Sequence, residues 1–207
     1  MKRFMFIALL FIILAPQVDA QMRGLPYTPR VRSWRLGLAA GMGVLGGDLT
    51  RESQNYHFRP IANLEVAYLL HKNFAVGGYL GGGYLRSTEL DMESNTSFIN
   101  AGILLEFRIP ILRGSVSPIF QLRSGPVSIS PELRTGPVTV EASSSINYSY
   151  DLAAGIEVMS YNRLGIRVLV GVTYTTTDEW DLLVRGNDND GYSFSMLSMH
   201  YYINPRR

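Results

Sequence analysis

Apolar and polar residues alternate strictly along much of the chain. In the stretch 34–45, Trp34, Leu36 and Leu38 fall on one face, whereas Arg35 falls on the other. Because successive residues of a β-strand point to opposite faces of a sheet, this pattern predicts a strand with one apolar face and one polar or small face. Equivalent patterns predict eight strands in all, at residues 34–45, 62–70, 74–85, 97–109, 116–123, 148–158, 164–174 and 192–203.

The connections between the predicted strands are alternately short and long. The short ones are 71–73, 110–114 and 160–163, and the long ones are 46–59, 86–96, 124–147 and 175–191. An even number of strands with short turns on one side and longer loops on the other is typical of an outer-membrane barrel with both termini in the periplasm. The sequence therefore predicts an all-β fold, an eight-stranded antiparallel up-and-down transmembrane β-barrel over residues 33–203.

The same alternation fits a soluble barrel of the lipocalin type, in which the apolar face points inward. Three features favour the membrane arrangement. The strands are long enough to cross about 25 Å of membrane when tilted. The polar faces are rich in Gly and Ala, which suits a narrow lumen, and aromatic residues lie near the ends of the apolar faces, as in membrane-interface girdles. Glycines on both faces of 74–85 leave the orientation of that strand open. The predicted interface aromatics are Trp34, Tyr68, Phe74, Phe107, Tyr148, Tyr174 and Tyr201.

The polar faces also carry a balanced set of charges. The predicted lumen charges are Arg35, Glu65, Glu106, Arg108, Arg123, Asp151, Glu157 and Arg167. An unpaired charge inside a narrow barrel would be strongly destabilising, so we expect these groups to pair. Because eight strands leave an interior just wide enough for side chains, the favoured interpretation is a salt-bridged plug, and an ion-selective constriction is the alternative.

The N-terminus has the order of regions of a secretory signal. Lys2 and Arg3 precede an apolar run at 4–15, and small residues around Ala20 suit cleavage before Gln21. The run is shorter than the roughly 20 residues of a membrane-spanning helix, although an uncleaved anchor is the alternative. The chain has no Cys, which excludes disulfides and a lipoprotein anchor. The predicted divisions are a signal peptide at 1–20, a periplasmic segment at 21–32, the barrel at 33–203 and a C-terminal tail at 204–207.

Few residues suggest chemistry. A formal net charge of +2 gives no electrostatic case for binding nucleic acid. The three histidines, His57, His71 and His200, fall at separate places in the predicted topology and could not converge on one metal or nucleophile. The run 188–191 resembles part of a calcium loop but lacks its other ligands, so we interpret it as a polar turn. We therefore expect no catalytic residue, metal site or cofactor, and no enzymatic activity.

The alternating Leu, Ala and Gly of segments such as 36–41 and 152–157 resemble the small outer-membrane β-barrel family that includes the OmpA transmembrane domain and OmpX. The resemblance implies location in the bacterial outer membrane, contact with its lipid and lipopolysaccharide, and folding by the barrel-assembly machinery. The leading functional interpretation is a structural or surface-interaction role. A narrow, porin-like diffusion channel and a lipid-A-modifying enzyme are the alternatives, and the sequence does not identify a loop ligand.

Overall fold

The computed structural model describes most of the predicted barrel. The described residues are 31–46, 57–89, 92–111, 115–135, 138–141, 143–159, 163–176, 180 and 190–203. The predicted signal peptide, nearly all of the segment 21–32 and the tail 204–207 lie outside these residues. Within the described residues, no helix is long and apolar enough to cross a membrane.

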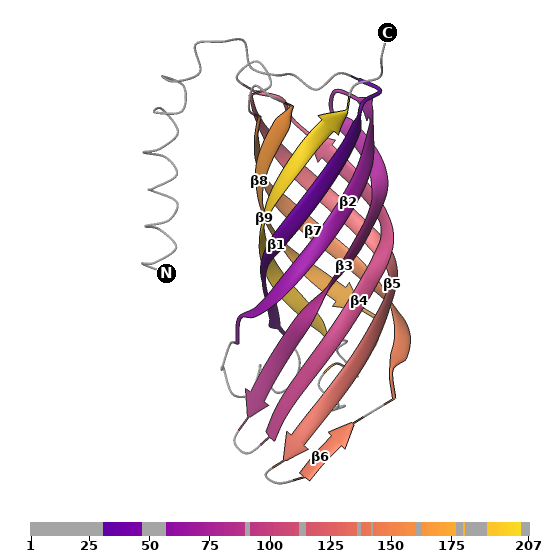
Figure 1. The fold of residues 1–207 in the computed structure, drawn as a ribbon, viewed down its shortest axis with the longest axis vertical. Coiled ribbons are helices and arrows are strands. Elements are labelled where there is room, and N and C mark those ends of the chain that lie inside the picture. Colours follow the sequence, from indigo (N-terminus) through magenta and orange to yellow (C-terminus); the bar gives the residue numbers. More distant parts are fainter. Residues whose placement is uncertain are drawn as a thin grey trace, which may run out of the picture.

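Eight long antiparallel strands form a closed barrel, and a ninth, short strand folds back at one end (Figure 1). The strands are β1 (Trp34–Leu45), β2 (Arg59–His71), β3 (Phe74–Glu89), β4 (Met92–Arg108), β5 (Val116–Thr135), β6 (Val138–Glu141), β7 (Ser145–Met159), β8 (Leu164–Thr175) and β9 (Gly191–Ile203). Pairing of β1 with β9, shown in indigo and yellow, and of β4 with β5 leaves the eight barrel strands without a free edge. The predicted fold class is confirmed.

The two ends of the barrel differ. The start of β1, the end of β9 and the connections β2–β3, β4–β5 and β7–β8 lie at one end, which we call the turn end. The connections β1–β2, β3–β4, β5–β7 and β8–β9 lie at the opposite end, which we call the loop end (Figure 1). The predicted alternation of short and long connections therefore places the short ones together.

Several strands continue further toward the loop end than the sequence predicts. Only residues 90–91 separate β3 from β4, so the expected long loop at 86–96 is wrong. The expected loop at 124–147 is also largely wrong, because β5 runs to Thr135 and pairs there with β6. These extensions are rich in Ser and Thr, and the β5 extension also carries an inward apolar face that includes Val127 and Ile129. Backbone pairing with a neighbouring strand, which is non-local, holds them in β conformation.

The wall of the barrel is apolar outside and polar inside. Leu38 is 66% exposed, whereas Arg35 on the same strand is fully buried. The structure also settles the orientation of β3, because Tyr79 and Leu85 face inward and Leu80 faces outward.

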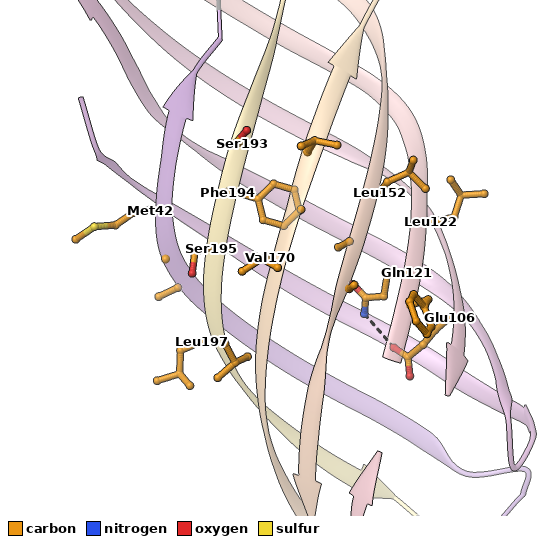
Figure 2. Close-up of a pocket in the computed structure, with 18 of the residues that line it drawn as sticks. Met42, Glu106, Gln121, Leu122, Leu152, Val170, Ser193, Phe194, Ser195 and Leu197 are labelled. Atoms are coloured by element: carbon orange, nitrogen blue, oxygen red, sulfur yellow. Dashed lines mark hydrogen bonds between the residues drawn. The ribbon is translucent and has the colours of Figure 1, made fainter. Parts of the chain in front are cut away.

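Figure 2 shows both faces of the wall in one view. Met42 and Leu197 point away from the barrel, whereas Phe194, Gln121 and Glu106 are buried within it. The pocket drawn there is lined by residues of both faces, so it follows the wall and is not an enclosed cavity inside the lumen.

Candidate functional site

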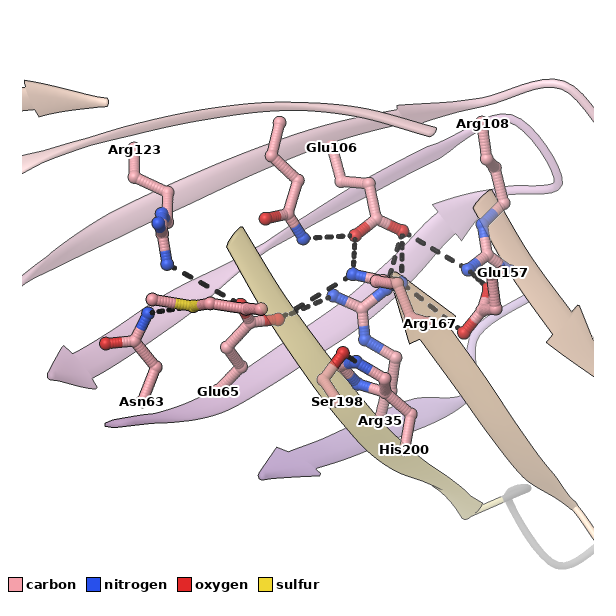
Figure 3. A network of polar contacts seen from close by, with 12 residues as sticks. Arg35, Asn63, Glu65, Glu106, Arg108, Arg123, Glu157, Arg167, Ser198 and His200 are labelled. Carbon is pink, nitrogen blue, oxygen red and sulfur yellow. Dashed lines mark hydrogen bonds and ion pairs between the residues drawn. The ribbon is translucent and has the colours of Figure 1, made fainter. Parts of the chain in front are cut away.

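The most distinctive site is a cluster of charged side chains inside the barrel. The structure places all eight predicted lumen charges there, each at most 2% exposed. They come from six strands, β1, β2, β4, β5, β7 and β8, and each lies at an inward position of its strand's alternation. Figure 3 shows that the arginine and carboxylate groups interleave rather than separate by sign.

Glu106 lies at the centre of the cluster. Its carboxylate is 2.5 Å from Nη1 of Arg35, 2.9 Å from Nη1 of Arg167 and 3.2 Å from Nη2 of Arg108. The side-chain amide of Gln121 donates a further hydrogen bond at 2.9 Å. Three guanidinium groups therefore surround one buried carboxylate (Figure 3).

Glu157 forms a second centre nearer the turn end. Arg108 donates to its carboxylate, and Nη2 of Arg167 is 3.4 Å from its Oε1. The hydroxyl of Tyr202 donates to Glu157 Oε1 at 2.8 Å and accepts from Nη2 of Arg108 at 2.7 Å. Charge-assisted hydrogen bonds of this kind are the stronger ones in proteins, so Tyr202 helps fix the ion pair.

Arg123 forms the third part of the cluster. Its Nε lies 3.1 Å from Oδ2 of Asp151. Its guanidinium also packs between the rings of Tyr79 and Phe194, with 5.1 Å from Cζ to each ring centroid. Contacts with two aromatic faces add cation–π attraction and exclude water from the ion pair.

Glu65 joins these parts into one network. Its carboxylate oxygens lie 3.5 Å from Arg35, 3.7 Å from Arg167 and 3.8 Å from Arg123. The four arginines and four carboxylates are therefore connected and equal in number. Removing one partner from such a network leaves a buried charge without compensation, which typically costs about 3–5 kcal/mol.

His200 and Ser198 face the same interior but take part in no ion pair with the described residues. Ser198 Oγ lies 2.8 Å from His200 Nε2, and both residues are buried. Gly37 on β1 makes room for this histidine, because a Cβ there would overlap His200 Nδ1 and Cε1. His200 lies on the predicted last strand, but its contact with Ser198 was not predicted, although the two-residue spacing on one face of the strand could have indicated it.

Among the described residues, this Ser–His pair lacks the third member of a catalytic triad. Within the described residues, His200 Nδ1 has no hydrogen-bond partner, so no carboxylate orients the imidazole as in a catalytic triad. His71 is exposed at the turn end and His57 precedes β2 at the loop end, so neither contributes. The described residues contain no group of three or more His, Asp or Glu side chains arranged to hold a metal.

An aromatic cluster lies inside the barrel toward the loop end. Trp180 is fully buried, with ring centroids 5.4 Å from Phe98 and 5.7 Å from Tyr192. Its backbone N–H donates to Oδ2 of Asp190 at 3.0 Å, and its carbonyl accepts from the hydroxyl of Thr96. No sequence signal indicated this role, because an isolated Trp in an expected loop has no periodicity.

The seven predicted interface aromatics lie on the outer surface. Six are between 37% and 58% exposed, and the seventh, Tyr68, is half-buried against Trp34 with ring centroids 5.0 Å apart. Five lie toward the turn end, whereas Tyr148 and Tyr174 lie toward the loop end. Three further exposed aromatics, which were not predicted, lie toward the loop end: Phe58, Tyr84 and Tyr150.

No protein-family model and no curated protein sequence matches this chain. Its structure is similar to that of Neisserial surface protein A, with a TM-score of 0.54 and 9% identity over 81% of this chain and 96% of that one. It is also similar to Ail, the attachment invasion locus protein of Yersinia pestis, with a TM-score of 0.53 and 13% identity over 84% of this chain and 100% of that one. A major outer membrane protein from Thermus thermophilus gives a TM-score of 0.50 and 14% identity, covering 82% and 99% of the two chains.

At these identities the likeness is one of fold. This chain has the fold of the small eight-stranded outer-membrane β-barrels, the class to which the resemblance of its sequence points.

Proposed function

We propose that this protein is an outer-membrane barrel with a structural or surface-interaction role, and that paired charges plug its lumen. The observation that carries the proposal is the inversion of the wall, with apolar side chains exposed outside and eight charged side chains buried inside. An exposed apolar wall of this kind suits lipid and would be poorly solvated by water. The short turns and both termini would then face the periplasm, and the loop end would face outward.

The plug is supported by the way in which the charges meet. Arg35 and Arg167 reach Glu106 from different sides of the barrel, so the contacts cross the lumen rather than line it. Trp180 supports the same conclusion, because it fills the interior nearer the loop end. A barrel filled in this way stabilises itself and presents its loops and rim to partners.

A narrow diffusion channel is the second candidate. The observation in its favour is the concentration of charged groups in the lumen, since rings of charged side chains select ions in pores. An enzyme is less well supported, because Ser198 and His200 are buried in the lumen rather than exposed at a rim facing lipid. We therefore propose no enzymatic activity. Lipid, lipopolysaccharide and the assembly machinery are the proposed partners.

Two measurements test the proposal. The protein extracted from an outer-membrane fraction is expected to migrate faster on a detergent gel when unboiled than when boiled, because a closed barrel resists detergent. In planar bilayers the folded protein is expected to give no steady conductance. A protein that is soluble in the periplasm would contradict the membrane assignment, and reproducible single-channel steps would favour the channel over the plug.

A further inference from the structure

The turn end of the barrel carries an exposed rim of basic residues. Arg32, Lys72 and Arg163 are all exposed there, one or two residues before the starts of β1, β3 and β8 respectively. We call these three residues the basic rim. None of them forms an ion pair with any residue that the structure describes.

The sequence segments that adjoin the strand termini at the turn end contain no acidic residue. The segments 21–33, 71–73, 109–115, 160–163 and 204–207 contain no Asp or Glu, and their basic residues are Arg23, Arg30, Arg32, Lys72, Arg113, Arg163, Arg206 and Arg207. The connections at the loop end have the opposite balance, since 46–58 and 176–190 together contain Asp48, Glu52, Asp178, Glu179, Asp181, Asp188 and Asp190 against Arg51 and Arg185. In the sequence, the segments next to the turn-end strand termini are therefore basic and these two loop-end connections are acidic, although the formal net charge is only +2.

Backbone conformation gives a second, independent observation. Arg32 and Arg163 have φ angles of 67° and 62°, and among the described residues they alone are non-glycine residues with positive φ. A left-handed backbone conformation is unfavourable for a residue that has a Cβ atom, such as Arg, and Gly or Asn usually occupies such positions. Main-chain hydrogen bonds fix both sites, from Arg32 N–H to Leu69 O at 2.7 Å and from Tyr202 N–H to Arg163 O at 2.9 Å. Strained residues held in this way are often functional, which favours a role for the two guanidinium groups.

The rim lies at the depth of the interface aromatics. Arg32 is two residues from Trp34, Lys72 is two residues from Phe74, and Arg163 precedes Leu164, which pairs with Tyr201. Exposed aromatic residues of this kind mark the level of lipid headgroups. Basic side chains next to them can therefore reach phosphate groups while their apolar stems lie along the wall.

We propose that the basic rim binds the phosphate groups of anionic phospholipids in the periplasmic leaflet of the outer membrane. The inference rests on the proposed function, because it requires the barrel to span a bilayer with its turn end at that leaflet. Lipid is favoured over a soluble anion because the rim follows the edge of the lipid-facing wall and forms no enclosed site. Attraction to an anionic lipid surface is worth about fivefold in affinity for each basic group near that surface.

The test uses the full protein refolded into phosphatidylcholine vesicles that contain phosphatidylglycerol. Spin-labelled forms of the two lipids measure how strongly each is immobilised by the protein. The wild type is compared with Arg32→Gln/Arg163→Gln, with the charge-retaining Arg32→Lys/Arg163→Lys, and with Arg59→Gln/Arg134→Gln, which removes two arginines at the loop end. Gln keeps a side chain at both left-handed positions, so the backbone strain is similar in each variant.

The wild type is expected to prefer phosphatidylglycerol, and added NaCl should weaken that preference. The Gln variant at the turn end should lose most of the preference, by at least about fivefold, whereas the Lys variant and the loop-end variant should retain it. A folded wild type without preference, or an equal loss in the two Gln variants, would overturn the proposal. Loss of the preference with inorganic phosphate but not with chloride at equal ionic strength would also overturn it, because the rim would then bind a free anion.

If the proposed function itself is wrong, the result differs from the one expected when only the lipid-binding proposal is wrong. In that case the wild type would show no boiling-dependent gel shift in vesicles, before any lipid preference is measured. If the Gln variant fails to fold, the lipid preference of the Lys variant and the salt dependence of the wild type still test whether the basic rim binds anionic lipid.

Discussion

Arg35 and Glu106 meet across the lumen, with Nη1 of the arginine 2.5 Å from Oε1 of the carboxylate. They are 71 residues apart in sequence and lie on β1 and β4, which are separated by two strands of the wall. Both side chains are fully buried. The contact therefore joins opposite parts of the barrel directly, and it exists only when the sheet closes.

Replacing Glu106 with Gln should destabilise the barrel. The variant keeps the shape of the side chain but leaves Arg35, Arg167 and Arg108 without the carboxylate that they share. The expected loss in the free energy of unfolding is about 3–5 kcal/mol, the usual effect of removing one partner of a buried ion pair. Urea unfolding in vesicles, followed by tryptophan fluorescence, measures it.

Glu93→Gln is the matched control. Glu93 pairs with Arg86 near the loop end at 2.5 Å, but both side chains are roughly 30% exposed, so the loss should stay below about 1 kcal/mol. The double variant Arg35→Gln/Glu106→Gln restores the balance of charge and should be more stable than Glu106→Gln alone. Equal stability of Glu106→Gln and the wild type would refute the buried network.

An arginine on the outer face should impair folding when it lies in the middle of the barrel wall, but not when it lies on the part of the sheet that projects past the barrel. Leu38→Arg introduces a charge at an exposed position of β1 and should cost about 2–4 kcal/mol if that face meets the bilayer core. Val140→Arg, at a similarly exposed position on the projecting β6, should be nearly neutral. The yield of the compact gel form on refolding into vesicles gives the comparison. Equal yields for the two variants would argue for a wall that faces water.

Gly37 should not tolerate a side chain. A Cβ at this position would overlap Nδ1 and Cε1 of His200, so Gly37→Ala must displace the buried imidazole. We expect a loss of about 1–3 kcal/mol, as for other overpacked interiors. Gly78→Ala is the control, because the nearest atom to its Cβ, the carbonyl oxygen of Gly102, is 3.4 Å away. A similar effect of the two substitutions in thermal unfolding would contradict the proposed packing.

Relief of backbone strain at the basic rim should stabilise the fold. Arg163→Gly removes the Cβ that disfavours a φ of 62°, so the free energy of unfolding should rise by about 0.5–1 kcal/mol. The same change at Arg134, in the extended β5, should lower it, since Gly weakens a strand. Chemical unfolding of the two variants measures whether their free energies of unfolding change in these opposite directions. Stabilisation at residue 163 would mean that Arg is retained there despite its cost to the fold.

Much of the barrel follows from local pattern. The predicted strand 34–45 coincides with β1. Leu36 and Leu38 face outward while Arg35 faces the lumen, so the apolar outside and the polar interior each leave a recognisable pattern in the sequence. The pattern fails where one environment is missing. In β3 the glycines carry no side chain to mark a face, so the orientation depends on the register with the neighbouring strands, in which Gly81 pairs with Asn63 and Asn100.

Contacts inside the lumen are only partly predictable. The inward position of each charge follows from alternation, but the convergence of three arginines on Glu106 depends on the register between strands and on barrel closure. Trp180 was missed for a related reason. Its burial depends on Phe98 and Tyr192, which reach it from two strands remote from each other in sequence.

The two tryptophans give the most direct test of the central claim, because they lie on opposite sides of the wall. Trp34 is 51% exposed on the outer face, and Trp180 is fully buried inside. Variants that keep one tryptophan each, Trp180→Phe and Trp34→Phe, are refolded into vesicles with brominated acyl chains, which quench only tryptophans that contact lipid. The account predicts strong quenching of Trp34 and little quenching of Trp180. Equal quenching of both, or accessibility of Trp34 to aqueous acrylamide without quenching by brominated lipid, would contradict a barrel with its apolar face in the membrane.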